Sequence, residues 1–192
     1  MANSEQELSD CQLVARIQEG DRAAFEALFR IYYEDLCDFV ESQVGASEVA
    51  EDLVQNVLLN VWRRRREWEL KTTLRAYLFG AARNESIKHR KKRKVWRRWR
   101  QEEKTAPEDA PDEPSPVEDV EYREVKRAMR DGVSKLPERR REVYMLSRHH
   151  GLTYEEIAAV MGISSKTVDN QMVEALKFLR EHLRSFLSAD AH

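Results

Sequence analysis

The stretch from Arg83 to Arg100 interleaves cations with Trp96 and Trp99, and it contains the run KHRKKRK. Lysine and arginine side chains neutralise phosphates, and indole rings stack on unpaired bases. This combination favours a nucleic-acid partner. A solvated run of charges is the alternative, but the tract continues a helical pattern that begins near Thr73, and this continuity favours the binding interpretation.

Polar and aromatic side chains on and just before this helix could reach a strand or the edges of bases. An asparagine amide can both donate to and accept from one base, which makes Asn84 a candidate for base reading. For Tyr77 and Trp68, a buried cap or core contact is an equally good interpretation. The candidates in this segment are Trp68, Thr72, Thr73, Arg75, Tyr77, Arg83, Asn84, Lys88, Lys91 and Lys92.

A second group of candidates follows a helix-turn-helix pattern. Thr153 and Glu156 have the spacing of a capping box, and Gly162 to Ser164 supply the short glycine turn between two helices. Apolar residues from Val168 to Leu183 share one face of the second helix, so the opposite face could enter a major groove. An ordinary helical hairpin is the alternative. The opposite face carries Lys166, Asn170, Val173, Glu174 and Lys177, with Asp169 beside them.

A third helix, predicted from Ser47 to Arg66, has an unusual polar face. Opposite its apolar stripe it presents Glu48, Asp52, Gln55, Leu59 and Arg63. An exposed leucine among polar groups indicates docking to another protein, although single exposed apolar residues are also common on protein surfaces. Both interpretations stay open at this point.

Composition and length define the elements that must position these side chains. The chain has 192 residues with only 6 glycines and 5 prolines, so few turns and long helices are expected. Four of the prolines fall between Pro107 and Pro116, in an acidic stretch without apolar periodicity. The sequence therefore predicts an all-α fold of two small helical domains, residues 1–101 and 120–188, joined by a flexible acidic linker at residues 102–119.

The formal net charge of −2 conceals strong asymmetry. Residues 1–61 carry −10, residues 62–104 carry +12, residues 105–125 carry −7 and residues 126–192 carry +3. A block of +12 within about forty residues is an electrostatic footprint for a polyanion. The charge distribution thus agrees with the motif evidence for nucleic-acid binding.

Several function classes are excluded by what the chain contains. Two cysteines, Cys11 and Cys37, provide neither a disulfide framework nor a metal-binding pair, and their apolar neighbours predict buried thiols. No grouping of nucleophile, base and orienting residue is legible, so we expect no enzyme activity, no metal and no cofactor. No apolar run approaches the ~18 residues needed to span a bilayer, and the N-terminus does not resemble a signal peptide, so we expect a cytoplasmic protein without membrane insertion.

Three segments carry a family resemblance: AEDLVQNVLLNVWRR, LRAYLFGAARNESIKHRKKRK, and LPERRREVYMLSRHHGLTYEEIAAVMGISSKTVDNQMVEALKFLREHL. In order and spacing, the chain resembles the sigma-70 family of bacterial RNA polymerase initiation factors, specifically its small two-domain extracytoplasmic-function group. The resemblance implies a region 2-like helical bundle and a region 4-like helix-turn-helix domain. It also implies a non-enzymatic factor that directs core RNA polymerase to promoters and promotes strand opening.

The resemblance assigns roles to the first domain. The loop from Trp68 to Thr73 would capture a flipped non-template base of the minus-ten element, and Asn84 would lie near the upstream edge of that element. Docking on the clamp helices of the largest polymerase subunit would use Glu48, Asp52, Gln55, Asn56 and Leu59.

The second domain would read the minus-thirty-five element and contact the polymerase flap. The family's pattern differs here, because Asp169 and Glu174 stand where arginines are frequent. An anti-sigma factor is the further implied partner, so the chain would be a monomer when free or a heterodimer with that factor. A stand-alone helix-turn-helix regulator that binds duplex DNA as a dimer is the alternative function. The residues implied in minus-thirty-five reading are Ser165, Lys166, Thr167, Asn170, Val173 and Lys177.

Overall fold

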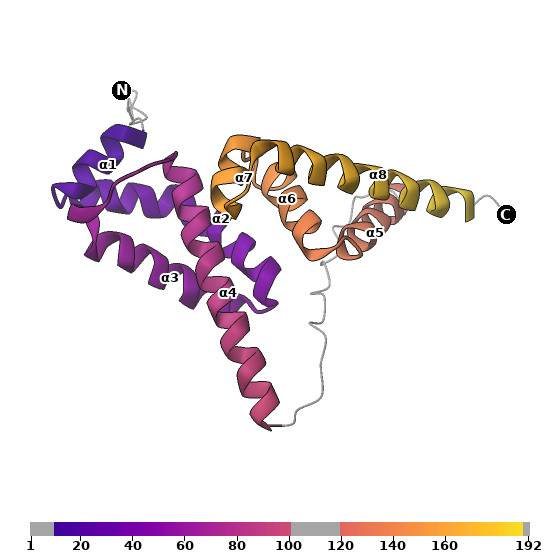
Figure 1. The fold of residues 1–192 in the computed structure, drawn as a ribbon, viewed down its shortest axis with the longest axis horizontal. Coiled ribbons are helices and arrows are strands. Elements are labelled where there is room, and N and C mark those ends of the chain that lie inside the picture. The colour runs from indigo at the N-terminus through magenta and orange to yellow at the C-terminus, as the bar shows by residue number, and fades with distance from the viewer. Residues whose placement is uncertain (1–9, 101–119, 190–192) are drawn as a thin grey trace. The chain divides into compact units, whose positions relative to one another are not determined.

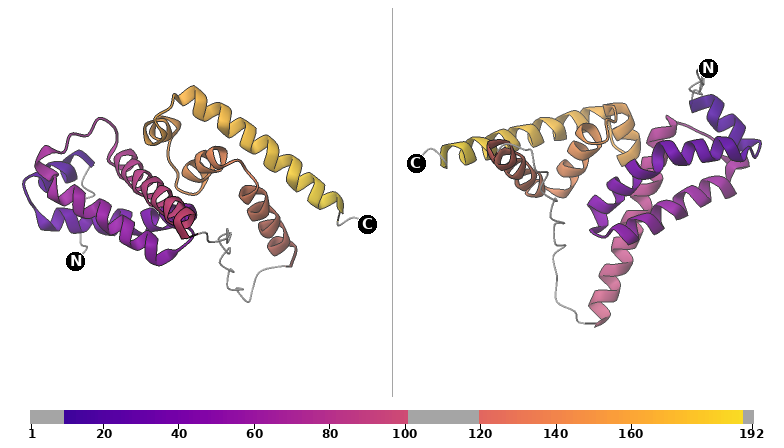
Figure 2. Two further views of the ribbon diagram at one scale, coloured as in Figure 1. Left: turned by 60° about the horizontal axis from the view of Figure 1, so that its bottom comes forward. Right: turned by 180° about the vertical axis from the view of Figure 1, so that it is seen from behind.

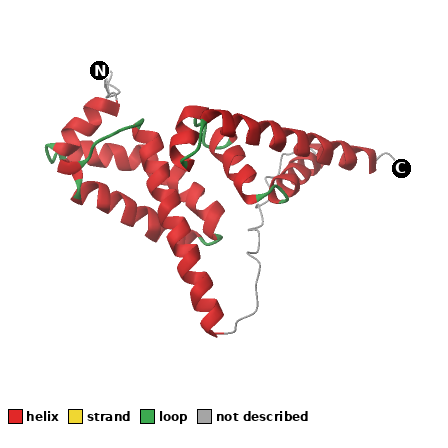
Figure 3. Cartoon of the chain, in the orientation of Figure 1, coloured by secondary structure: helices red, strands yellow, loops and turns green. Residues whose placement is uncertain are grey.

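The computed structural model describes residues 10–100 and 120–189, and within these ranges all regular structure is helical (Figure 3). The predicted all-α class with two helical domains is therefore confirmed. The chain divides into two compact units, one of residues 1–108 and one of residues 109–192. The expected linker at residues 102–119 lies outside the described residues.

The described part of the first unit, residues 10–100, contains four α-helices and one short 3₁₀ helix (Figure 1). Helix α2 packs against α1, α3 and α4, and α3 also packs against α4. Their apolar faces form a core that contains the fully buried side chains of Leu28, Leu36, Phe39, Leu58 and Phe79. The elements are α1 (Asp10–Gln18), α2 (Arg22–Val44), α3 (Ser47–Arg63), η1 (Arg65–Glu67) and α4 (Leu74–Arg100).

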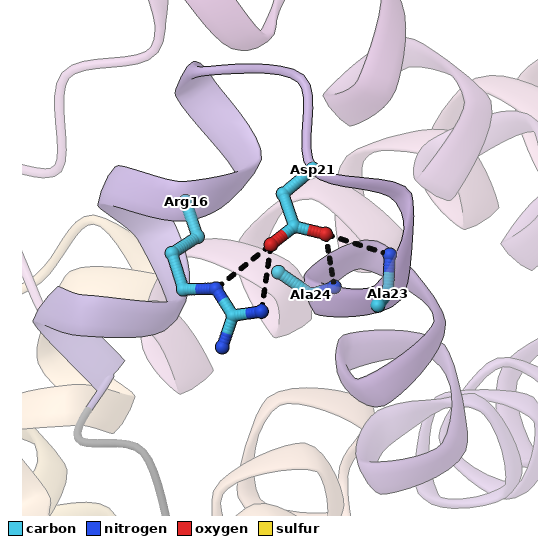
Figure 4. A network of polar contacts seen from close by, with 4 residues as sticks. All are labelled: Arg16, Asp21, Ala23 and Ala24. Carbon is cyan, nitrogen blue, oxygen red and sulfur yellow. Dashed lines mark hydrogen bonds and ion pairs between the residues drawn. The ribbon is translucent and has the colours of Figure 1, made fainter.

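The turn between α1 and α2 is held by one carboxylate, shown in Figure 4. Asp21 accepts hydrogen bonds from the backbone N–H groups of Ala23 (2.9 Å) and Ala24 (3.3 Å), and it pairs with Arg16 at 2.7 Å. The Arg16 hydrogen bond, together with the Ala24 N–H, holds the pKa of Asp21 below its usual value. Asp21 is thus the N-cap of α2 and also ties that helix to α1.

Helix α4 is 27 residues long, about 40 Å at the rise of an α-helix. Thr73 precedes it and accepts a hydrogen bond from the Ala76 N–H through its hydroxyl (3.2 Å). The first half packs on α2 and α3, whereas the second half extends beyond the other helices of this unit, as the views in Figures 1 and 2 agree. The side chains from Lys91 to Trp96 are accordingly exposed.

The second unit is organised around its last helix. Helices α5 (Val120–Ser134), α6 (Glu138–Arg148) and α7 (Tyr154–Met161) all pack against α8 (Ser165–Ala189). The predicted capping box is present, with Thr153 and Glu156 exchanging hydrogen bonds of 3.2 and 2.9 Å. Gly162 ends α7 with φ of +64°, a left-handed conformation that favours glycine. The helix-turn-helix expected from the sequence is therefore formed by α7 and α8.

Two expectations about the cysteines need correction. Cys11 is exposed, because α1 buries Leu13, Val14 and Ile17 and leaves Cys11 on its solvent side. Cys37 is only half-buried, and this partial burial raises the pKa of its thiol. Apolar neighbours in the sequence therefore predicted burial poorly, since the helical register and not the neighbours decides which side faces the core.

Among the described residues, no helix combines the length and the apolar content that a membrane span requires. Over the same residues, no group of three or more His, Cys, Asp or Glu side chains is arranged to hold a metal ion.

Candidate nucleic-acid interface

A shallow depression between α3 and α4 collects several of the expected DNA-binding residues. Tyr77, Asn84 and Lys88 recur at helical spacing on the face of α4 that meets α3, and all three line the depression. Its volume is ≈ 200 Å³. The complete lining is Val57, Asn60 and Val61 from α3, Arg64 directly after α3, and Tyr77, Ala81, Asn84, Glu85 and Lys88 from α4.

The opposite wall of this depression contains two residues that sequence reasoning missed. Asn60, in the last turn of α3, and Arg64, the residue that follows this helix, are both exposed. The available signal was their spacing of four, which places both on the flank of the helix between the buried stripe and the expected docking face. Only the packing of α3 against α4 shows that this flank meets Asn84 and Lys88.

Charge within the depression is mixed. The ammonium group of Lys88 pairs with the Glu85 carboxylate at 2.7 Å, and the Lys88 side chain is 70% exposed. The guanidinium of Arg64 lies 3.6 Å from the carboxylate of Glu67, and both side chains are at least 75% exposed. Such exposed pairs contribute little to stability, so both cations remain available to an anionic partner.

The end of α3 adds further positive charge beside the depression. Arg63 to Arg66 are consecutive, and with Glu67 they line a second surface hollow of ≈ 380 Å³. Arg65 is held in place, because its guanidinium lies 4.3 Å from the centre of the Trp62 ring and donates to the Trp62 carbonyl (2.8 Å). Arg64 lines both hollows, so the two form one continuous basic surface.

The Trp68 side chain packs in the core of the first unit. Its side chain is buried, at 5% exposure, and its ring packs against Tyr77 with centroids 5.3 Å apart. Its carbonyl accepts a hydrogen bond from the Gln18 side chain (2.6 Å). Of the two interpretations that the sequence left open for Trp68, the structure supports the core contact. Burial of a large indole ring is strongly favourable. The contact with Trp68 holds the Tyr77 ring in place.

Other DNA-binding candidates at the start of α4 make contacts within the first unit. Arg75 pairs with Asp35 of α2 at 3.0 Å and lies over the Phe79 ring, which ties α4 to α2. Thr73 caps the helix, while the exposed Thr72 hydroxyl donates to the Thr73 carbonyl (3.4 Å). Thr72 and Thr73 thus lie on the surface. Arg75 holds α4 against α2 through its ion pair with Asp35.

The remaining cations of the tract lie further along α4. Arg83 is half-buried, whereas Lys91 and Lys92 are exposed on the half of the helix that leaves the unit. They lie on the same helix as the depression, beyond Lys88, and therefore extend its positive charge away from the core.

The expected docking face on α3 is a separate surface. Glu48, Asp52, Asn56 and Leu59 are all exposed on it, and Leu59 is 47% exposed. Gln55 is also exposed, but it hydrogen-bonds the Tyr33 hydroxyl of α2. That bond acts to lower the pKa of Tyr33, while burial and the Cys37 thiol act to raise it, and the net pKa lies above 10.0.

The first turns of α8 present the other expected DNA surface. Lys166, Asn170, Val173 and Lys177 are exposed on one face, and Val173 is 55% exposed. Ser165 and Thr167 are half-buried. The backbone N–H of Thr167 donates to the Ser164 hydroxyl (3.2 Å), so Thr167 belongs to the cap of the helix.

The acidic residues on this surface are also exposed. The Asp169 side chain points to solvent. The Glu174 carboxylate lies 3.9 Å from the Arg140 guanidinium of α6. Because Arg140 partly offsets the charge of Glu174, we expect Glu174 to repel DNA phosphates less than Asp169 does.

Comparison with known families gives two matches in chain order. The model described as "Sigma-70 region 2" matches residues 28–98, and the model described as "Sigma-70, region 4" matches residues 126–179. The first match contains the depression and the docking face, and the second contains the helix-turn-helix.

Individual relatives align over most of the chain. The RNA polymerase sigma-E factor of Streptomyces coelicolor is 31% identical over 165 residues, covering 85% of this chain and 88% of that protein. The ECF RNA polymerase sigma factor SigF of Caulobacter vibrioides is 30% identical over 175 residues, covering 90% and 92% respectively. Among solved structures, the sigma factor RpoE in complex with the anti-sigma factor NepR from Bartonella quintana matches with a TM-score of 0.62 and 26% identity, covering 83% of this chain and 96% of that chain.

Proposed function

The chain belongs to the extracytoplasmic-function group of the sigma-70 family of transcription initiation factors, and from this membership we propose how its surfaces work. The family resemblance expected from the sequence is confirmed by both region matches and by relatives that align over most of their length. We propose that the protein binds core RNA polymerase, directs it to promoters and helps to open the strands there.

The observation that carries this proposal is the presence of two separate surfaces on the first unit. One is the exposed α3 face with Asp52, Asn56 and Leu59, and the other is the basic surface of the α3–α4 depression and outer α4. A factor that joins polymerase to DNA needs both surfaces at once. A stand-alone regulator would leave the α3 face without a role, and the family membership does not favour that alternative.

Strand opening in this proposal requires no nucleotide hydrolysis. Unpairing and unstacking a base costs a few kcal/mol, and contacts to the extruded base together with polymerase binding offset that cost. Asn84, Lys88 and Tyr77 are the proposed contacts within the depression, while Lys91 and Lys92 attract the backbone. Trp68, Thr73 and Arg75 serve by holding the start of α4 in position. No catalytic step, metal or cofactor enters this mechanism.

The second unit is proposed to read the minus-thirty-five element through the first turns of α8. Lys166, Asn170, Val173 and Lys177 supply the exposed contacts. Asp169 and Glu174 reduce the positive charge, so we expect this unit to bind duplex DNA weakly on its own and to depend on attachment to polymerase.

An anti-sigma factor is the further proposed partner. The similar RpoE structure was solved in complex with the anti-sigma factor NepR. Since promoters and polymerase occupy the cytoplasm of bacteria, we also propose that the protein acts there.

The test is complex formation with core polymerase on a native gel, followed by run-off transcription from genomic fragments. We expect a stable complex and discrete transcripts that depend on the protein. The Leu59→Glu variant should lose the complex, because it places a charge in an apolar contact.

Ile31→Glu is the matched control for this variant, since Ile31 is an exposed aliphatic residue at 62% on the neighbouring α2. It should retain the complex. Absence of any complex with the wild-type chain, or specific duplex binding by a dimer without polymerase, contradicts the proposed function.

A further inference from the structure

Resting on the proposed function, we propose that Gln18 of α1 is a positioning residue for strand opening. It acts on the segment from Trp68 to Thr73, which joins η1 to α4 and which the family resemblance places against the opened strand. The match to the region 2 model begins at residue 28, so α1 lies outside that match and receives no role from it. Its role follows instead from two contacts between α1 and η1.

The first contact is a hydrogen bond from a side chain to the backbone. The Gln18 Nε2 group donates to the Trp68 carbonyl at 2.6 Å, although the two residues are 50 positions apart. Trp68 is the residue that ends η1, and its backbone is extended, with φ of −78° and ψ of 104°. From Trp68 to Thr73 the chain forms no regular helix or strand. Gln18 therefore fixes the backbone at the point where regular structure stops.

The second contact fixes the beginning of η1 at the same end of α1. Gly20 lies just after α1 with φ of +91°, and a Cβ atom at this position would lie 3.7 Å from the Arg65 Nε atom. The Arg65 guanidinium is thus beside the C-terminal end of α1, where the helix carbonyls concentrate negative partial charge. Because Arg65 also packs on the Trp62 ring, η1 is held between α1 and the end of α3.

The other end of the segment is fixed separately. The Thr73 hydroxyl accepts a hydrogen bond from the Ala76 N–H at 3.2 Å, and Lys71 and Thr72 are exposed between the two fixed ends. A segment with both ends fixed has fewer conformations to lose when it contacts a strand. Removal of the Gln18 hydrogen bond frees one end. Binding must then supply the lost conformational entropy, so the affinity for the opened strand falls.

The Gln18 hydrogen bond also acts on the α3–α4 depression through one ring. The Trp68 ring packs against Tyr77 with centroids 5.3 Å apart, and Tyr77 lines the depression. The docking face with Asp52 and Leu59 is a separate surface of α3. Gln18 should therefore affect contacts with opened DNA and leave polymerase docking unchanged.

The test uses holoenzyme made from core polymerase and the full chain, on a promoter that carries a pre-opened mismatched bubble. Gln18→Met and Gln18→Lys both introduce unbranched side chains of high helix propensity, but only lysine can donate to the Trp68 carbonyl. The methionine variant should bind the bubble roughly three- to tenfold more weakly, as expected for the loss of one hydrogen bond, and the lysine variant should stay within about twofold of the wild type. The affinity for core polymerase should be unchanged in both variants.

Hydrogen exchange of the free full chain gives a readout that is independent of polymerase. The N–H groups of Glu67 and Trp68 are hydrogen-bonded within η1 and its cap. They should exchange faster in Gln18→Met than in the wild type or Gln18→Lys, because η1 opens more often without its support. Glu19→Met is the matched control, since it makes a similar change at the exposed next position. It should keep the wild-type exchange and the wild-type affinity for the bubble.

Three results overturn the inference alone. In the first, the wild-type holoenzyme binds the bubble and transcribes, and Gln18→Met does so equally well. In the second, Gln18→Lys is as weak as Gln18→Met, so the hydrogen-bond donor is not what matters. In the third, Gln18→Met loses affinity for core polymerase to the same extent, which indicates general damage to the fold. Failure of the wild-type chain to form any holoenzyme is distinguishable, because it overturns the proposed function while the exchange measurement still reports on the contact between Gln18 and Trp68.

Discussion

The carboxylate of Asp21 performs two tasks at the junction of α1 and α2. It caps α2 through the Ala23 and Ala24 N–H groups, and it pairs with Arg16 at 2.7 Å. Both interactions favour the charged form, and the pKa of Asp21 is lowered accordingly. The capping role was predictable from sequence because it depends on immediate neighbours, whereas the Arg16 pair depends on how the chain turns at Gly20.

This lowered pKa predicts an acid-sensitive contribution to stability. Since the folded pKa lies below 3.8, the contribution is complete above about 3.8 and is lost as the pH falls through the folded value. Asp21→Asn retains a capping side chain but loses the charge. We expect its melting temperature, followed by circular dichroism, to fall less than that of the wild type between about pH 6 and about pH 3.

Asp38→Asn is the control for this measurement, because Asp38 is an exposed aspartate in the middle of α2. It should reproduce the wild-type pH dependence. Identical pH dependence of the Asp21→Asn variant and the wild type would show that the Arg16 pair contributes nothing.

Some side chains of the candidate site are placed by one helix alone, and others only by the packing of two helices. Asn84, Lys88 and Tyr77 were candidates because of their residue types and their place on one helix, and all three line the α3–α4 depression. Asn60 and Arg64 were not predicted, because their relevance arises from contact between two helices. Trp68 was ambiguous in sequence, since a tryptophan serves equally well for stacking on a base and for filling a core.

At the scale of the element, the boundaries of α7 and α8 follow from local signals. The capping box at Thr153 and the glycine turn from Gly162 to Ser164 are both formed as the sequence predicted, and Ser164 caps α8. Each depends on residues within one turn of the chain, so no tertiary information was needed.

The capping box predicts a measurable loss on substitution. Thr153→Ala leaves the Glu156 N–H without its side-chain acceptor and removes half of the reciprocal pair. We expect the second unit to lose about 1 kcal/mol of unfolding free energy. Chemical denaturation followed by Tyr fluorescence or circular dichroism measures it.

Thr72→Ala serves as the comparison, since Thr72 is exposed and makes only a 3.4 Å contact to a neighbouring carbonyl. Its unfolding free energy should stay within about 0.5 kcal/mol of the wild type. Equal losses in the two variants would deny the capping box a stabilising role.

At the scale of the whole molecule, charge distribution was more informative than net charge. Within the +12 block of residues 62–104, Arg63 and Arg64 lie at the end of α3 and Lys88 to Lys94 lie on α4, on and beyond the α3–α4 depression, whereas the −10 of residues 1–61 includes the α3 docking face. Proline and charge patterns sufficed to predict two helical units. They could not predict the α3–α4 depression, because it is formed by the packing of side chains distant in sequence.

The cationic tract predicts a specific salt dependence. Replacing Lys91, Lys92, Arg93 and Lys94 by glutamine removes exposed charges without altering the core. Open-complex formation should weaken, and the slope of log affinity against log salt should flatten by roughly 0.7–0.9 for each lost phosphate contact. Filter binding or anisotropy over a salt series measures this slope.

Arg22→Gln combined with Arg30→Gln provides the comparison, because these exposed cations lie on α2 away from α4. The slope should then remain that of the wild type. A slope unchanged by the four substitutions in the tract would mean that these side chains only contact solvent.

The outer half of α4 has a further property that follows from its exposure. From Lys88 to Lys94, lysines and arginines recur at spacings of three and four, where like charges repel one another, and the side chains from Lys91 to Trp96 are exposed. Added ions screen this repulsion over a Debye length of about 10 Å at 0.1 M. Salt therefore acts on this segment in two opposite directions, stabilising its helical conformation while weakening its attraction to phosphates.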